Sequence, residues 1–92
     1  MYEISTELYK QVADRLVPLI AEKEYFSGSF EFHFGEIRCR MILSAIIFNG
    51  GKITPVWWEF RTYNQIEMEM NNDFSFSELL NHINTTKHYE NN

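Results

Sequence analysis

Three strand-like runs separated by two short glycine-containing turns fill the middle of the sequence and constrain the fold most. Residues 30–34 alternate phenylalanine with polar side chains, which is the period-two pattern of a half-buried strand. Gly35-Glu36 forms a tight turn, and a second apolar run follows over 37–48. Asn49-Gly50-Gly51 is a hairpin signal, because Asn and Gly adopt positive φ at low cost, and a third run covers 52–63. The order predicts an antiparallel meander.

Hairpin closure fixes which side chains share a face of this sheet. A turn centred on Gly35-Glu36 sets Phe34 opposite Ile37 and Phe30 opposite Met41. Moving the second turn by one residue shifts the register by two, which leaves the faces unchanged. The predicted core face, on which the helices should lie, therefore holds Phe30, Phe32, Phe34, Cys39, Met41, Leu43, Ala45, Ile47, Val56, Trp58 and Phe60.

The opposite, outer face is apolar at the end near the second turn. Exposed apolar patches of this kind usually mark a partner site. The candidate interface consists of Ile42, Ile46, Phe48, Ile53, Pro55 and Trp57. The alternative is that residues 18–25 or the C-terminal tail fold over these side chains.

The other end of the outer face is charged. Arg38, Arg40 and Arg61 are candidates for an anion-binding site, with Glu31 and Glu59 beside them. In one register Arg40 lies between these two glutamates. We favour the alternative interpretation, a ladder of cross-strand ion pairs, because the two carboxylates would neutralise most of the positive field.

A helix is predicted on each side of the strands. Ser5 is a suitable N-cap for the first helix, whose apolar residues recur at three- and four-residue steps. Pro18 disrupts the helical ladder, so we expect a kinked or two-part helix that ends near Lys23, with a stop near Leu16 as the alternative.

The last helix has the strongest local signal. Ser75 and Glu78 form a capping box, and Phe74 with Leu79 forms a hydrophobic staple. This helix is expected to run from Phe76 to about Thr85, with fraying over 87–92. Between the third run and this helix, residues 66–70 are either a short fourth strand or irregular; the sequence leaves both open.

Together these elements predict a single domain over 1–92 with a two-layer α+β fold. Its antiparallel meander of three to four strands carries an N-terminal and a C-terminal helix on one face, in the order α-β-β-β-(β)-α. A chain of 92 residues with 45% hydrophobic content suits one small core. The one cysteine excludes a disulfide framework, and without a leader or a membrane-length apolar run we expect a cytoplasmic location and no membrane partner.

Catalytic and metal-binding patterns are weak. Cys39 points into the predicted core, so we interpret it as a packed thiol, and His33 lies on the other side of the sheet. His82 and His88 are spaced so that they do not share a helix face. We therefore expect no metal, no cofactor and no enzymatic activity. The net charge of −5 also argues against a general nucleic-acid binder.

These observations favour a small interaction or regulatory domain that uses the outer sheet face. The simplest partner is a second copy, because a face with one charged and one apolar end can be self-complementary about a two-fold axis. The alternative function is binding of an anionic ligand or single-stranded nucleic acid on the same face. Arg38, Arg40 and Arg61 would then supply charge, and Trp57 would supply a stacking platform.

Overall fold

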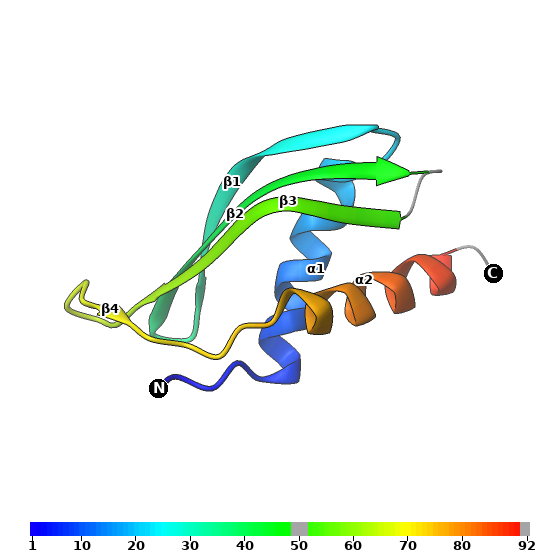
Figure 1. Ribbon diagram of the computed structural model, residues 1–92. Coiled ribbons are helices and arrows are strands. Elements are labelled where there is room, and N and C mark those ends of the chain that lie inside the picture. Colours follow the sequence, from blue (N-terminus) through cyan, green and yellow to red (C-terminus); the bar gives the residue numbers. More distant parts are fainter. Residues whose placement is uncertain (49–51, 91–92) are drawn as a thin grey trace.

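The computed structural model describes residues 1–48 and 52–90, the last seven of these by their backbone alone. Two helices and four strands follow one another as α1 (Thr6–Ile20), β1 (Tyr25–Phe34), β2 (Ile37–Phe48), β3 (Lys52–Tyr63), β4 (Glu69–Met70) and α2 (Phe76–Glu90). The strands form one antiparallel sheet in the order β1-β2-β3-β4. Both helices lie on one side of this sheet (Figure 1). The predicted two-layer α+β fold is confirmed.

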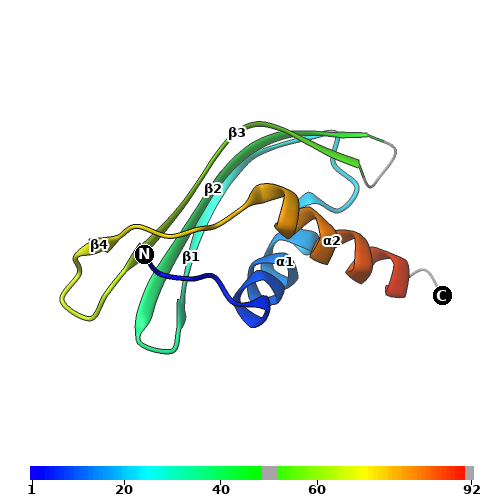
Figure 2. The same cartoon turned by 60° about the horizontal axis from the view of Figure 1, so that its bottom comes forward.

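The sheet is bent, and the bend determines where the core lies. The long strands arch over the two helices, which lie on the concave side (Figures 1 and 2). The most buried side chains come from α1, the middle of β2 and the start of α2, among them Leu8, Leu16, Met41, Leu43 and Leu79. The convex side of the sheet, opposite the helices, is the face that the sequence predicts to be the outer one (Figures 1 and 2).

The first hairpin closes as predicted. Gly35 has a φ of +60°, which a glycine adopts without strain, and Phe34 faces Ile37 across the turn. However, β1 begins at Tyr25, five positions before the predicted start at Phe30. Ser27, Gly28 and Ser29 obscure the alternation in the sequence, because none of them is apolar enough to mark a face.

A bulge in β3 overturns part of the predicted face assignment. Ser44 pairs with Trp57 but Ala45 pairs with Pro55, which leaves Val56 without a partner on β2. One extra residue reverses the faces of everything beyond it. Ile53 is therefore a core residue at 6% exposure rather than an outer one, and Val56, predicted in the core, is 62% exposed.

The first helix is a single element. The Ser5 hydroxyl accepts a hydrogen bond from the Leu8 backbone N–H at 3.2 Å, which confirms the N-cap. The prediction of a two-part helix ending near Lys23 is wrong: α1 continues through Pro18 and ends at Ile20. Pro18 cannot donate a hydrogen bond to the carbonyl four residues earlier, yet the helix continues past it for two residues.

The start of the last helix follows the prediction. The Ser75 hydroxyl accepts from the Glu78 N–H at 3.4 Å, and Phe74 and Leu79 are both buried. The helix continues beyond Thr85 to Glu90. The predicted fraying is therefore wrong for residues 87–90, which are helical, and residues 91–92 lie outside the described residues.

The fourth strand, between β3 and α2, is shorter than the predicted strand over residues 66–70. Only Glu69 and Met70 pair with β3, opposite Tyr63 and Thr62. Residues 64–68 are a turn in which the Asn64 side-chain oxygen accepts from the N–H groups of residues 66 and 68, both at 3.0 Å.

The N-terminus is tied to the segment that leads into α2. The Tyr2 N–H donates to the Asn71 carbonyl at 2.7 Å, and the Tyr2 carbonyl accepts from the Asp73 N–H at 3.3 Å. The Ile4 N–H then donates to the Asp73 carboxylate at 2.7 Å. These bonds hold the entry to α1 beside the entry to α2.

Candidate functional site

The outer face keeps four of the six predicted interface residues. Ile46, Phe48 and Trp57 are exposed by 39%, 53% and 50%, and Ile42 beside them is half-buried. The two others do not belong there, because the bulge turns Ile53 into the core and sets Pro55 opposite core residue Ala45.

Tyr25 extends this surface and was missed in the sequence. It pairs with Ile46 across the first ladder and is 54% exposed. If the predicted strand is extended back from Phe34 to Tyr25, Phe26 falls on the core face and Tyr25 on the outer face. This alternation was the signal in the sequence that could have identified Tyr25. We define the outer patch as Tyr25, Ile42, Ile46, Phe48 and Trp57.

No described segment covers the outer patch. Residues 18–25, one of the two proposed covers, instead lead from α1 into β1, so that Tyr25 itself becomes part of the patch. The backbone of α2 runs along the opposite side of the sheet as far as Glu90 (Figures 1 and 2). The exposed side-chain area is on the order of 400 Å² for aromatic and aliphatic groups of this size.

The charged end of the outer face is organised around Arg38 and Arg61. Arg38 lies 2.7 Å from Glu31 and 2.8 Å from Glu67, with its guanidinium 4.1 Å from the centre of the Tyr63 ring. The hydrogen bond to Glu67 is the main reason that the pKa of Arg38 is raised. Arg38 is therefore already engaged on both sides.

Arg61 is held in the same way. It bonds to Glu59 at 2.6 Å and to Glu69 at 3.3 Å, and the bond to Glu59 is the main cause of its raised pKa. Two of the three candidate arginines therefore belong to ion-pair clusters. These clusters differ from the predicted cross-strand ladder, because Glu59 lies on the same strand as Arg61 and Glu67 lies in the turn before β4.

Arg40 differs from its neighbours. The register places it between Glu31 and Arg61, while Glu59 faces Ile42 instead. The register that would place Arg40 between two glutamates is therefore not the one that the sheet adopts. Among the side chains that the structure describes, those of residues 1–48 and 52–83, none forms an ion pair with Arg40, and the Arg40 side chain is exposed.

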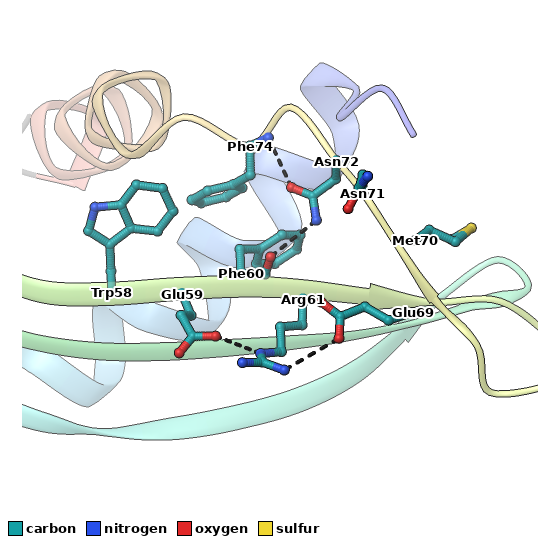
Figure 3. A pocket seen from close by; sticks show the side chains of 9 residues that line it. All are labelled: Trp58, Glu59, Phe60, Arg61, Glu69, Met70, Asn71, Asn72 and Phe74. Atoms are coloured by element: carbon teal, nitrogen blue, oxygen red, sulfur yellow. Dashed lines mark hydrogen bonds and ion pairs between the residues drawn. The ribbon is translucent and has the colours of Figure 1, made fainter. Parts of the chain in front are cut away.

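A hollow of about 320 Å³ opens where β3 and the segment before α2 diverge. Trp58, Phe60 and Phe74 lie on its helix side, while Glu59, Arg61 and Glu69 lie on its outer side (Figure 3). Its lining has no histidine, cysteine or serine, and Arg61 bridges its carboxylates. The two carboxylates of the lining, those of Glu59 and Glu69, are thus both paired with Arg61.

Asn72 closes the inner end of this hollow. Its side-chain amide donates to the Phe60 carbonyl at 3.1 Å and to the Thr62 hydroxyl at 3.2 Å. Its side-chain oxygen accepts from the Phe74 N–H at 3.0 Å (Figure 3). Asn72 therefore fixes the path from β4 to α2.

The remaining chemical candidates are separated in space. Cys39 is fully buried, and burial raises the pKa of its thiol to about 11, so it is a poor nucleophile at neutral pH. His33 is exposed on the outer face, and His82 stacks on Tyr9 at 5.5 Å between ring centres. The His88 side chain lies outside the described part of the structure. Among the described residues, no group of three or more histidines, cysteines and acids could hold a metal ion.

Comparison with known proteins gives no relative: no family model, no curated protein and no solved structure matches the chain. Over the described residues, neither helix is long and apolar enough to cross a membrane.

Proposed function

We propose that this protein is an interaction domain that pairs with a second copy of itself through the outer patch. The observation that carries the proposal is the group of exposed aromatic residues on three neighbouring strands, Tyr25, Phe48 and Trp57, around Ile46. Aromatic side chains are enriched at protein interfaces and dominate their energetics.

The size of the patch supports a dimer of this kind. A stable interface buries about 800 Å² on each partner, of which the apolar patch would supply roughly half. The remainder would come from the small polar residues between the patch side chains, Ser27, Ser44 and Thr54, which lie on the same face. About a two-fold axis through the patch, the ion-pair clusters of Arg38 and Arg61 fall at the rim, where charged groups remain hydrated.

The alternative ligand, an anion or single-stranded nucleic acid on Arg38, Arg40, Arg61 and Trp57, has less support. Arg38 and Arg61 each already contact two carboxylates, which leaves Arg40 as the one candidate arginine without an ion pair among the described residues. A net charge of −5 further opposes polyanion binding.

Sedimentation velocity from low to high micromolar concentration tests the proposal. The wild-type protein should form dimers as concentration rises, and Trp57→Glu should remain monomeric without losing its fold. Ile66→Glu is the matched control, because Ile66 is an exposed apolar residue in the loop before β4, away from the patch. A wild-type monomer at every concentration, or equal dissociation by Ile66→Glu, would contradict the proposal.

A further inference from the structure

The two long edges of the sheet differ in how well they are protected against pairing with another strand. On β3, Pro55 has no N–H to donate, and Val56 forms a bulge. The Phe60 carbonyl already accepts a hydrogen bond from the Asn72 side chain. β4 also covers the end of this edge at Thr62 and Tyr63. Proline, bulges and covering segments are the features that block edge pairing in natural sheets.

The β1 edge has none of these features. Its ten residues, Tyr25–Phe34, pair with β2 without a register shift and include no proline and no lysine. No described element lies along its free side, because β1 is the first strand in the sheet order (Figure 1).

The direction of the free backbone groups in β1 follows from one hydrogen bond. The Ile47 N–H donates to the Glu24 carbonyl at 2.9 Å, so Glu24 points toward β2. Successive residues of a strand point their backbone groups to opposite sides. The N–H and C=O groups of Tyr25, Ser27, Ser29, Glu31 and His33 therefore point to the open edge.

The helix side of this edge combines aromatic rings with positive charge. Phe26, Phe30 and Phe34 are only half-buried there. The Arg15 guanidinium lies 4.3 Å from the centre of the Phe32 ring, and the Lys23 ammonium lies 5.7 Å from that of Phe26. Neither cation forms an ion pair with a carboxylate of the described residues.

We propose that the β1 edge binds an extended, acidic and apolar segment of another protein as an additional strand of the sheet. The backbone of the segment would bond to the free groups of β1, as in known cases of strand addition. Its apolar side chains would cover Phe30 and the other half-exposed rings. Its acidic side chains would face Arg15 and Lys23. This surface shares only Tyr25 with the outer patch, through the Tyr25 backbone, and strand addition does not require self-association through the patch.

The positions of the two cations give the spacing of the acids. Phe26 and Phe32, over which they lie, are six positions apart in the strand. This separation corresponds to roughly 20 Å, so the acids should also be six positions apart, with apolar residues between them on the same face. Glu22 and Glu24 flank Lys23 in the chain and weaken its field, so Arg15 should make the stronger contact.

Charge distinguishes this partner from a second copy of the chain. The helix-side positions of β1 are four phenylalanines and Gly28 between Phe26 and Phe34, none of them acidic. A second β1 strand would therefore leave Arg15 and Lys23 unneutralised, whereas an acidic segment would pair with them.

Selection from a display library of random peptides about twelve residues long tests the proposal directly. The bait is the Trp57→Glu variant, so that self-association through the outer patch plays no part. Peptides with acids six positions apart and apolar residues between them should be enriched. Failure to enrich this pattern would overturn the proposal, whatever the outcome for the outer patch.

A pair of edge variants tests the binding mode of the enriched peptides. Ser29→Pro removes an N–H that points to the open edge but not one that bonds to β2, and should weaken binding at least about tenfold. Ser29→Ala keeps the N–H and should bind like the parent. Equal binding by both variants would overturn strand addition.

A third variant keeps the test valid if proline disturbs the fold. Arg15 is an exposed residue of α1 whose other contact is Gln11, so Arg15→Gln should leave the unfolding midpoint nearly unchanged. It should reduce affinity for the acidic peptides several-fold and flatten the dependence of binding on salt. Unchanged affinity and salt dependence would contradict the assigned role of Arg15.

Discussion

The hydroxyl oxygen of Tyr9 lies 2.9 Å from the backbone nitrogen of Ser75 and accepts its hydrogen bond. Tyr9 belongs to α1 and Ser75 is the residue before α2, so this bond joins the two helices where α2 begins. The Tyr9 ring also packs against Phe74 at 5.3 Å between centres. Tyr9 thus accepts a hydrogen bond from the N–H of the α2 N-cap, and its ring packs beside the same end of the helix.

We expect Tyr9→Phe to lower the free energy of unfolding by about 1–2 kcal/mol, because it leaves the Ser75 N–H without its partner in a partly buried position. Urea unfolding measures this loss. Tyr25→Phe, which removes a hydroxyl from an exposed tyrosine, should cause no measurable change. Equal effects of the two substitutions would show that the Tyr9 bond contributes nothing to stability.

Alkaline pH should destabilise the protein through Cys39. Burial raises the pKa of its thiol from 9.0 to about 11, so the folded state holds its proton more tightly than the unfolded state. The resulting stability is complete below pH 9.0 and is lost as the pH rises toward about 11. Burial raises the pKa of Tyr9 as well, which acts in the same direction.

Unfolding free energies of the wild type and Cys39→Ala, compared from neutral pH to about pH 11, isolate the thiol. The variant should start less stable because of the cavity but should lose less stability on going to alkaline pH. Parallel curves for the two proteins would contradict the assigned direction of the pKa shift.

Because of the bulge, aspartate substitutions at Ile53 and at Val56 should have very different effects on stability. Ile53→Asp should unfold the protein, because it places a carboxylate among buried apolar side chains. Val56→Asp should change stability by less than about 0.5 kcal/mol, because Val56 is exposed. Circular dichroism with urea unfolding checks both. If Val56→Asp proved more destabilising than Ile53→Asp, the bulge would be contradicted and the predicted faces, with Val56 in the core and Ile53 outside, would hold.

The two adjacent tryptophans should also differ. Trp58 is half-buried on the helix side, with ring centres 5.5 Å from Phe74 and 5.8 Å from Phe76, so Trp58→Ala should cost about 2–3 kcal/mol. Trp57→Ala should cost the monomer less than about 1 kcal/mol, with its main effect on association. Unfolding over a range of protein concentrations separates the two effects. If Trp57→Ala lowered the free energy of unfolding more than Trp58→Ala at every concentration, the assignment of the core to the helix side of the sheet would be contradicted.

Local signals predicted most of this fold because they depend on near neighbours. Gly35 determined the first turn, and with it the pairing of Phe30 with Met41. Ser75 and Glu78 determined the start of α2 for the same reason. Each feature depends on residues within a few positions of one another, where spacing and backbone preference decide the outcome.

The bulge was not predictable in this way, because it depends on how β3 fits a bent β2. Residues 55–58 are four consecutive apolar residues, so no alternation of polar and apolar side chains shows where one residue will be skipped. Pro55 was a partial hint, since proline cannot donate to the ladder and favours strand edges and bulges.

The candidate site inherited this error. Ile46, Phe48 and Trp57 were placed correctly because β2 is regular and Trp57 lies on the near side of the bulge. Ile53 was misplaced because it lies beyond it. The sequence also did not show that Arg40 lacks an ion pair among the described side chains, since this depends on which of several nearby carboxylates each long side chain reaches.

The bonds between Tyr2 and residues 71–73 join the start of the chain to a segment that is synthesised much later. Ribosomes deliver the N-terminus first, yet the entry to α1 is completed by residues from the last quarter of the chain. Until residues 71–73 and α2 have been synthesised, the apolar stripe of α1, which includes Leu8 and Val12, lacks part of the structure that buries it. A chain that stops before residue 71 lacks these bonds, and it should therefore expose an apolar helix of the kind that chaperones and proteases bind.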